Sequence, residues 1–186
     1  MNLLLHVCCA PCTIYPFTVL QQEGFKVTGY FHNPNIHPFL EFKRRLSTLE
    51  QFSSASNLSL IVDKEYGLRD FVRKVAFHEE ERCQICYLLR LEKTVSLAKI
   101  LGFEAFTTTL LYSKYQSHSL LIEICRSLST SYGVEFLYRD FRSGWQYGVD
   151  RSMDLNMYRQ PYCGCIYSEQ ERYDKSLRKK INPRNT

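Results

Sequence analysis

Short apolar runs and longer stretches of helical periodicity alternate along the chain as far as Phe141. Runs rich in β-branched and aromatic residues predict five strands, at Asn2–Val7, Phe25–Phe31, Leu58–Val62, Ala105–Leu111 and Val134–Tyr138. Apolar side chains at helical spacing predict five helices, at Thr13–Glu23, Phe39–Ser56, Leu68–Phe77, Cys83–Leu101 and Ser117–Tyr132. This alternation predicts an α/β, Rossmann-like fold of three layers, with a mostly parallel sheet of about five strands.

The helix predicted at Cys83–Leu101 carries the longest periodic stripe. Its buried side is expected at Cys86, Leu89, Thr94, Leu97 and Leu101. Gly102 follows this helix, and Gly24 and Gly133 follow two of the others. Glycine commonly ends helices, so these positions fix where the connecting loops begin.

Polar residues follow three of the predicted strands. Cys8 comes directly after the first strand, Asn33 lies just beyond the second and Ser113 beyond the fourth. Parallel sheets bind ligands beyond the carboxyl ends of their strands, so these loops should share one crevice. The alternation stops at Phe141, and we expect the polar, aromatic C-terminal segment to fold back over that crevice.

Length and composition bound the class of protein. A chain of 186 residues is most simply one α/β domain, residues 1–186, whose basic last stretch, 169–186, is expected to be flexible. No apolar run approaches the roughly 18 residues of a membrane span, and no secretory signal is visible, so we expect a cytoplasmic protein without a membrane partner. The net charge of +5 permits binding to a polyanion but does not require it.

Eight cysteines in a protein expected in the reducing cytoplasm indicate metal binding or redox chemistry. Seven of them form three motifs, which are Cys8-Cys9-Ala10-Pro11-Cys12, Cys83-Gln84-Ile85-Cys86 and Cys163-Gly164-Cys165. We expect the three motifs to converge on one site. Cys125 stands alone on an apolar helix face and is interpreted as a core residue.

The number of sulfur atoms constrains the metal. Seven thiols exceed the four ligands of a tetrahedral zinc ion and the four of one [4Fe–4S] cluster. The surplus suggests a cluster with a second metal, or a cluster with a redox-active pair of thiols. One zinc ion with spare thiols, in an RNA-binding module without redox activity, is the alternative. A nucleotide-binding domain is disfavoured, because the chain has no Gly-x-x-x-x-Gly-Lys or Gly-x-Gly-x-x-Gly motif.

Polar residues beyond the second and fourth strands are candidates for substrate contacts. Asn33 and Asn35 lie in the loop that follows the second strand, where a substrate is expected. Ser113 follows the fourth strand, where a phosphate contact is expected. Thr107–Thr109 is interpreted as β-branched strand residues without a role in the site.

A short aromatic segment near the last cysteine motif indicates contact with RNA. Tyr158 and Tyr162 flank Arg159, and such side chains can stack on the unpaired bases of an RNA loop. Arg82 and Arg90 also lie near cysteine motifs, but most arginines are solvated surface groups. We therefore predict substrate contacts for the aromatic segment and assign no role to Arg82 or Arg90.

The motifs taken together resemble the QueH family of epoxyqueuosine reductases. The matching segments are Leu4–Cys12, Phe31–Ile36, Glu41 with Arg44 or Arg45, Glu81–Tyr87 with Arg90, Phe106–Leu111 with Ser113, and Tyr158–Ser168. The resemblance covers the chain from about Leu3 to Ser168. Gly144–Gly148 reads Gly-Trp-Gln-Tyr-Gly where the family often has a glycine–tyrosine segment, and some members carry aspartate at the position of Cys12.

The resemblance implies the last step of queuosine synthesis. In that step the epoxide of epoxyqueuosine, within tRNA, is reduced to an alkene. The family implies a [4Fe–4S] cluster and a neighbouring mononuclear metal, iron or zinc, and it implies no cobalamin. The implied partners are the anticodon stem–loop of the tRNA and an external electron donor, such as a ferredoxin-like protein.

The resemblance also suggests how the seven thiols are divided. We predict four cluster ligands, which are Cys9, Cys83, Cys86 and Cys163. Aspartate is a hard oxygen ligand and suits an iron–sulfur cluster poorly, so its presence in relatives at position 12 indicates a contact with the second metal. We therefore predict that Cys12 holds this metal together with Cys8 and Cys165. Cys12, Asn33 and Arg159 are predicted to act in catalysis.

Overall fold

The computed structural model describes residues 1–176 and has an α/β fold built on a five-stranded sheet. The strand order is β3-β2-β1-β4-β5, and every neighbouring pair is parallel. The strands are β1 Asn2–His6, β2 Lys26–Phe31, β3 Ser59–Val62, β4 Ala105–Thr108 and β5 Glu135–Phe136. The predicted fold class and the parallel five-stranded sheet are confirmed.

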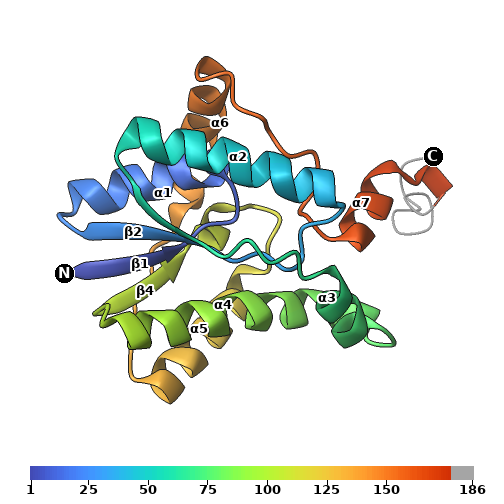
Figure 1. Cartoon of the computed structure of the whole chain (residues 1–186), viewed down its shortest axis with the longest axis horizontal. Coiled ribbons are helices and arrows are strands. Elements are labelled where there is room, and N and C mark those ends of the chain that lie inside the picture. The colour runs from blue at the N-terminus through green and yellow to red at the C-terminus, as the bar shows by residue number, and fades with distance from the viewer. Residues whose placement is uncertain (177–186) are drawn as a thin grey trace.

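Helices cover both faces of the sheet and give the three layers. The elements between the strands are α1 Ala10–Gln22, α2 Phe39–Ser56, α3 Leu68–Val75, η1 Glu79–Glu81, α4 Arg82–Leu101 and α5 His118–Tyr132. Figure 1 shows α1 and α2 on one face of the sheet and α4 and α5 on the other. Among the described helices, none has both the length and the apolar character that crossing a membrane requires.

The central strand, β1, brings the first cysteine motif to one edge of the sheet. Leu3, Leu4 and Leu5 are fully buried, as expected for a parallel strand covered on both faces. Leu5 pairs with Gly29 of β2 on one side and with Thr107 of β4 on the other. Because all strands run in the same direction, the segments that follow β1, β2 and β4 meet at one edge, the carboxyl edge.

Two strands are shorter than the sequence predicted. β4 ends at Thr108, because the chain turns there into the 3₁₀ helix η2, Thr109–Tyr112. The Thr108 hydroxyl accepts a 3.1 Å hydrogen bond from the N–H of Leu110 and so starts this turn. β5 keeps only Glu135–Phe136 of the predicted Val134–Tyr138, because it pairs with β4 at two positions.

The buried face of α4 also differs from the predicted stripe. Two adjacent rows with a four-residue repeat are buried, at Cys86, Tyr87, Arg90, Leu91, Thr94, Val95 and Ala98. Leu101, which the predicted stripe included, is 53% exposed. The rows are buried because α4 packs on β1 and β4 along them, and they bring a buried arginine, Arg90, into the interior.

The C-terminal segment leaves the alternating pattern and returns to the carboxyl edge (Figure 1). It contains the short helical elements η3 Phe141–Gly144, α6 Trp145–Asp154 and α7 Ile166–Tyr173. Between α6 and α7 the Gln160 side chain reaches the sulfur atom of Cys9, so the predicted folding back is confirmed. The helices α6 and α7 were not expected. Of the tail predicted at 169–186, residues 177–186 lie outside the described residues.

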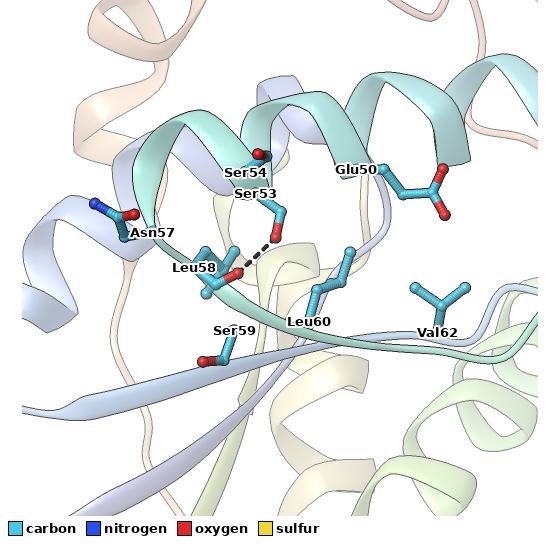
Figure 2. A pocket seen from close by; sticks show the side chains of 8 residues that line it. All are labelled: Glu50, Ser53, Ser54, Asn57, Leu58, Ser59, Leu60 and Val62. Carbon is cyan, nitrogen blue, oxygen red and sulfur yellow. Dashed lines mark hydrogen bonds between the residues drawn. The ribbon is translucent and has the colours of Figure 1, made fainter.

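A depression of about 520 Å³ lies between α2 and β3. Its lining residues are Glu50, Ser53, Ser54, Asn57, Leu58, Ser59, Leu60 and Val62. Figure 2 shows the Ser53 hydroxyl donating a 2.5 Å hydrogen bond to the carbonyl of Leu58, which ties the end of α2 to the start of β3. The lining contains no cysteine or histidine, so this depression is separate from the cysteine motifs.

Candidate metal and redox site

Three buried thiols meet where β1 ends and α1 begins. The sulfur atoms of Cys8, Cys9 and Cys12 all lie within 4.8 Å of one another, and those of Cys8 and Cys9 are 3.7 Å apart. Cys9 has an extended backbone at the N-cap of α1, and Cys12 follows in the first turn. The strand end and the helical turn therefore direct all three thiols to one point. These residues form the thiol triad.

Two polar side chains contact the sulfur atoms of the triad. The Thr109 hydroxyl accepts a 3.1 Å hydrogen bond from the N–H of Cys8 and lies 3.4 Å from its sulfur as a donor. The interpretation of Thr109 as a strand residue was wrong, because Thr109 begins η2 and contacts Cys8 there. Nε2 of Gln160 donates to the sulfurs of Cys9 (2.8 Å) and Cys12 (3.5 Å).

The protons of the triad are unevenly distributed. Hydrogen bonds from the Cys12 and Cys9 thiols hold the pKa of Cys8 well below its usual range. Burial raises the pKa of Cys9, and hydrogen bonding to Cys8 raises the pKa of Cys12. A thiolate that is shared by two thiols is suited to receive a metal cation, which releases the remaining protons when it binds.

The other four motif thiols lie together between the start of α4 and the C-terminal turn. Cys86 and Cys165 belong to one small apolar cluster with Phe71. Burial raises the pKa of Cys86 to about 12, with smaller contributions from the charges of Cys163 and Cys165. Burial also raises the pKa of Cys83, and the charges of the same two sulfurs add to this effect. These residues, Cys83, Cys86, Cys163 and Cys165, form the four-thiol group.

The thiols lie in groups that differ from the predicted division, while the assignment of each group to a metal stays a prediction. Cys9 lies with Cys8 and Cys12, because it follows the first directly and caps the helix that carries the second. Cys165 lies apart from the triad, in the apolar cluster that contains Cys86. Within the four-thiol group, Cys83 and Cys163 are exposed, so one side of the group is open to solvent.

The turn that carries Cys163 and Cys165 requires glycine between them. Gly164 has a φ of +147°, a conformation that residues with side chains rarely adopt. A Cβ atom there would also lie 3.1 Å from Nδ2 of Asn35. The N–H of His37 donates a 2.7 Å hydrogen bond to the carbonyl of Gly164. The loop after β2 therefore positions the C-terminal turn.

Arg45 holds the turn that carries Cys163 and Cys165. It is 1% exposed and donates from Nη1 to the carbonyl of Cys163 (2.8 Å) and from Nη2 to the carbonyl of Tyr162 (3.0 Å). Its Nε donates to a carboxylate oxygen of Glu41 at 2.7 Å, and the hydroxyl of Tyr158 donates to the other oxygen. One buried ion pair therefore holds two segments that are more than a hundred residues apart in the sequence.

Arg90 lies between the triad and the four-thiol group. Its guanidinium is 2% exposed and donates to Oδ1 of Asn33 at 2.8 Å and to the sulfur of Cys86 at 3.7 Å. Burial alone would lower its pKa, but the charges of Cys86 and Cys8 raise it above its usual value. Arg90 therefore keeps a buried positive charge beside both groups of sulfur atoms.

The three polar residues that were predicted to contact substrate, Asn33, Asn35 and Ser113, differ in burial and in hydrogen bonding. Asn33 is buried and connects Arg90 to the end of β1 through a 3.0 Å hydrogen bond to the carbonyl of Val7. Both amide atoms of Asn35 are buried and have no hydrogen-bond partner among the described residues. Ser113 accepts a hydrogen bond from the N–H of Tyr115 at 3.2 Å, which is a turn contact.

The aromatic segment predicted to stack on RNA divides between the interior and the surface. The hydroxyl of Tyr162 donates to the carbonyl of His37, and its ring lies 5.5 Å from the guanidinium of Arg45. The hydroxyl of Tyr158 donates a hydrogen bond to the Glu41 carboxylate, whereas Arg159 is exposed. Tyr158 and Tyr162 therefore already have partners within the protein.

Several residues that contact the site were given no role in it from the sequence. Glu41, Arg45 and Arg90 were noted only as matches to the family's motifs, and Thr109, Gln116 and Gln160 were not singled out for the site. The signal for the two arginines was available, because Arg45 and Arg90 each lie four residues from a buried position on the apolar side of a helix. The glutamines gave no such signal. Gln116 donates to the sulfur of Cys163 at 3.1 Å only because the loop after η2 passes the C-terminal turn.

The chemistry of the donor atoms fits metal binding. Seven thiols, all free, are soft ligands of the kind that iron–sulfur clusters, zinc and iron use. Four of them can hold a cluster, and three leave an open position on a second metal. Oε1 of Gln160 is buried without a partner among the described residues, beside the triad. The donor atoms therefore suit metal binding at the triad, and the four-thiol group offers the number of thiolates that a cluster would need.

The fold alone has a solved counterpart. The crystal structure of a predicted subunit of a tRNA methyltransferase from Methanocaldococcus jannaschii superposes with a TM-score of 0.53. The two chains are 13% identical, and the match covers 81% of this chain and 74% of the other. At that identity the similarity supports the α/β architecture and nothing further.

Comparison of sequences identifies the family, which the structural similarity does not. A protein from Dehalococcoides mccartyi named epoxyqueuosine reductase QueH is 39% identical over 174 residues, which are 94% of this chain and 96% of that one. Proteins of the same name from Streptococcus pyogenes (34% identical, covering 90% and 70%) and Thermotoga maritima (33%, covering 94% and 93%) are also similar. The family model described as epoxyqueuosine reductase QueH matches residues 3–171. The chain therefore belongs to the QueH family of epoxyqueuosine reductases, which are oxidoreductases.

Proposed function

We propose that this protein reduces epoxyqueuosine in tRNA to queuosine. Both bonds from carbon to the epoxide oxygen break, two electrons enter the new carbon–carbon double bond, and the oxygen leaves as water with two protons. The electrons come from an external one-electron donor, such as a ferredoxin-like protein. Family membership together with seven thiols at the carboxyl edge supports this proposal.

We further propose that the four-thiol group, Cys83, Cys86, Cys163 and Cys165, holds a [4Fe–4S] cluster. The thiol triad, Cys8, Cys9 and Cys12, then holds a single second metal, iron or zinc. A cluster supplies electrons one at a time, and a metal with an open coordination position acts as a Lewis acid toward the epoxide oxygen. The close approach of the triad sulfurs and the exposure of Cys83 and Cys163 support this division.

The protein's own side chains prepare the site for negative charge. Arg90 and Arg45 are buried cations. Burial lowers the pKa of both, but the charges of nearby sulfurs, joined at Arg45 by the Glu41 carboxylate, raise it above the usual value. The two arginines offset the repulsion among thiolates that would otherwise oppose the binding of metal and the uptake of electrons. Asn33 holds the Arg90 guanidinium in place.

Gln160 and Arg159 are placed to meet the substrate. The Gln160 carboxamide lies on the sulfurs of Cys9 and Cys12 and therefore covers the triad on the side of the C-terminal segment. Arg159 is the neighbouring exposed cation, and we propose that it contacts a phosphate of the tRNA.

Anaerobic reconstitution tests the proposal. The protein, loaded with iron and sulfide and supplied with dithionite, should convert epoxyqueuosine in an anticodon stem–loop to queuosine, as measured by mass spectrometry of the nucleosides. It should contain about five irons per chain if iron fills both sites. A well-folded protein that holds one zinc ion, binds RNA and gives no turnover would instead support the zinc-binding RNA module.

A further inference from the structure

Five aromatic rings beside the thiol triad contact one another. Tyr112 stacks on Trp145 with ring centroids 5.2 Å apart, and Tyr115 meets Trp145 edge-on at 5.6 Å. Tyr15 lies 6.5 Å from Tyr112 and 5.9 Å from Tyr147. The rings come from α1, η2, the loop after η2 and α6. These residues, Tyr15, Tyr112, Tyr115, Trp145 and Tyr147, form the aromatic face.

The aromatic face begins at the triad. The 3₁₀ helix η2 starts with Thr109, whose hydroxyl lies 3.4 Å from the sulfur of Cys8, and ends with Tyr112. Cys12 and Tyr15 are three residues apart on α1, so their side chains lie on the same side of the helix. The rings therefore lead from the sulfur atoms toward the surface.

Exposure increases along this path. Tyr112 is 3% exposed, Tyr147 is 50% exposed and Tyr115 is 84% exposed. Packing accounts for Tyr112, which also donates a 2.9 Å hydrogen bond to the carbonyl of Trp145. Packing does not account for Tyr115, because most of its ring is in water, where an aromatic side chain gains little stability.

Two glycines shape the aromatic face. A Cβ atom at Gly144 would lie 2.2 Å from the ring of Tyr15, and one at Gly148 would lie 2.2 Å from the hydroxyl of Tyr112. Glycine at both positions therefore lets α6 lie directly against these rings. The Gly-Trp-Gln-Tyr-Gly segment thus presents the rings of Trp145 and Tyr147 beside the triad.

Positive charge accompanies the rings. Nζ of Lys114 lies 5.8 Å from the centroid of the Trp145 ring, and Lys114 is exposed. Arg159 is exposed and directly precedes Gln160, whose carboxamide lies on the sulfurs of Cys9 and Cys12. Exposed rings next to exposed cations are the features that bind single-stranded nucleic acid.

We propose that the aromatic face binds the unpaired bases that flank the modified base in the RNA loop, with Lys114 and Arg159 on their phosphates. This inference rests on the proposed function and identifies where that substrate is held. Stacking on Tyr115 and Trp145 keeps neighbouring bases apart from the target base, whose epoxide then reaches the triad. RNA suits the face better than a protein does, because rings and cations together match bases and phosphates.

Binding of an unmodified anticodon stem–loop, followed by fluorescence anisotropy over a range of salt concentrations, tests the proposal without any reaction. Tyr115→Ala should weaken binding by about 5- to 150-fold, the range that loss of a stacked ring produces. The salt dependence should stay as in the wild type, because no charge is removed. Tyr115→Phe, which keeps the ring, should bind normally. Lys114→Gln should lower the slope of log affinity against log salt by about 1.

Phe77→Ala is the matched control, because Phe77 is 96% exposed and lies in the loop between α3 and η1. It should bind RNA like the wild type. Wild-type affinity in Tyr115→Ala, in a protein that binds the stem–loop and reduces epoxyqueuosine, would overturn this inference and leave the proposed function standing. A wild-type protein that neither binds the stem–loop nor reduces its epoxyqueuosine would overturn both.

Discussion

Nη1 of Arg90 lies 3.7 Å from the sulfur of Cys86, one turn earlier on α4. The guanidinium is held in this position by its 2.8 Å hydrogen bond to Oδ1 of Asn33. A buried charge is costly unless it is paired, and the partners that raise the pKa of Arg90 are the sulfurs of Cys86, Cys8 and Cys163. The interior of this fold is therefore prepared for a negatively charged group of sulfurs.

Replacement of Arg90 tests this arrangement. In Arg90→Met the cation is lost, so adding an electron to a neighbouring cluster becomes less favourable. We expect the reduction potential to fall by about 60 mV or more, which is a tenfold change in the equilibrium for one electron. A redox titration of the reconstituted protein, followed by electron paramagnetic resonance, measures the change.

Arg90→Lys separates the charge from the shape of the side chain. It keeps the charge but cannot contact both Cys86 and Asn33 in the same way, so the potential should stay closer to the wild-type value than in Arg90→Met. Equal potentials in the wild type and in Arg90→Met would show that the cation does not act on the redox centre.

Two adjacent arginines on α2 provide a second test. Arg45 is buried and holds the carbonyls of Tyr162 and Cys163, whereas Arg44 is exposed and lies over the ring of Tyr158. Arg45→Met should free the C-terminal turn, leave the Glu41 carboxylate unpaired and cost about 3–5 kcal/mol. Iron content after reconstitution should fall sharply.

Arg44→Met is the matched control for Arg45→Met. It should keep the wild-type iron content and change stability by less than about 1 kcal/mol, as expected for an exposed side chain. Similar iron losses in both variants would contradict a specific role for Arg45 in holding the turn.

Much of the fold follows from local pattern. The apolar run at β1 and the glycines after α4 and α5 predicted the elements correctly, because burial on both faces and left-handed helix ends leave clear signals. The end of β4 did not follow from the pattern. The threonines after Phe106 favour a strand locally, but the hydroxyl of Thr108 starts a turn that sequence alone does not show.

The sequence identified the thiols of the candidate site but not how they are grouped. Cysteine motifs are visible as residue types, so all seven thiols could be named. Their grouping depends on tertiary packing, which puts Cys165 into the apolar cluster with Cys86 and leaves Cys9 beside Cys12. Arg90 was missed because an arginine in a helical sequence usually faces water, and its burial depends on a thiol one turn away.

The division of the thiols can be tested with two single replacements. Cys165→Ala should abolish cluster assembly, because it removes one sulfur of the four-thiol group. Cys12→Ala should retain the visible absorbance of the cluster but lose the extra metal and most of the turnover. Cys12→Asp should retain the cluster, part of the extra metal and part of the turnover. Mössbauer spectroscopy with iron counting distinguishes the two sites. Loss of the cluster in Cys12→Ala, with retention in Cys165→Ala, would reverse the proposed division.

The eighth cysteine is a control for the other seven. Cys125 is fully buried on α5 within the main core. Cys125→Ala should therefore lower the free energy of unfolding by about 1 kcal/mol through the lost packing. Metal content and activity should remain near wild type. A well-folded Cys125→Ala protein that fails to assemble its metal centre would show that this thiol has a role beyond packing.

Acid should destabilise the protein partly through His37. Its ring is buried 5.2 Å from that of Phe71, Nε2 donates to the carbonyl of Pro34 at 3.0 Å, and burial lowers its pKa to about 4. In the unfolded chain the pKa is about 6.5, so between these values the unfolded state binds a proton that the folded state does not. The free energy of unfolding should therefore fall with falling pH, with a contribution of up to about 1.4 kcal/mol per pH unit from this group.

In His37→Gln, urea unfolding of the metal-free protein between pH 6 and about pH 4.5 should show a free energy of unfolding that depends less steeply on pH, by that amount. The other buried histidine, His6, is common to both proteins and cancels in the comparison. Identical slopes in the two proteins would show that His37 does not contribute to the loss of stability in acid.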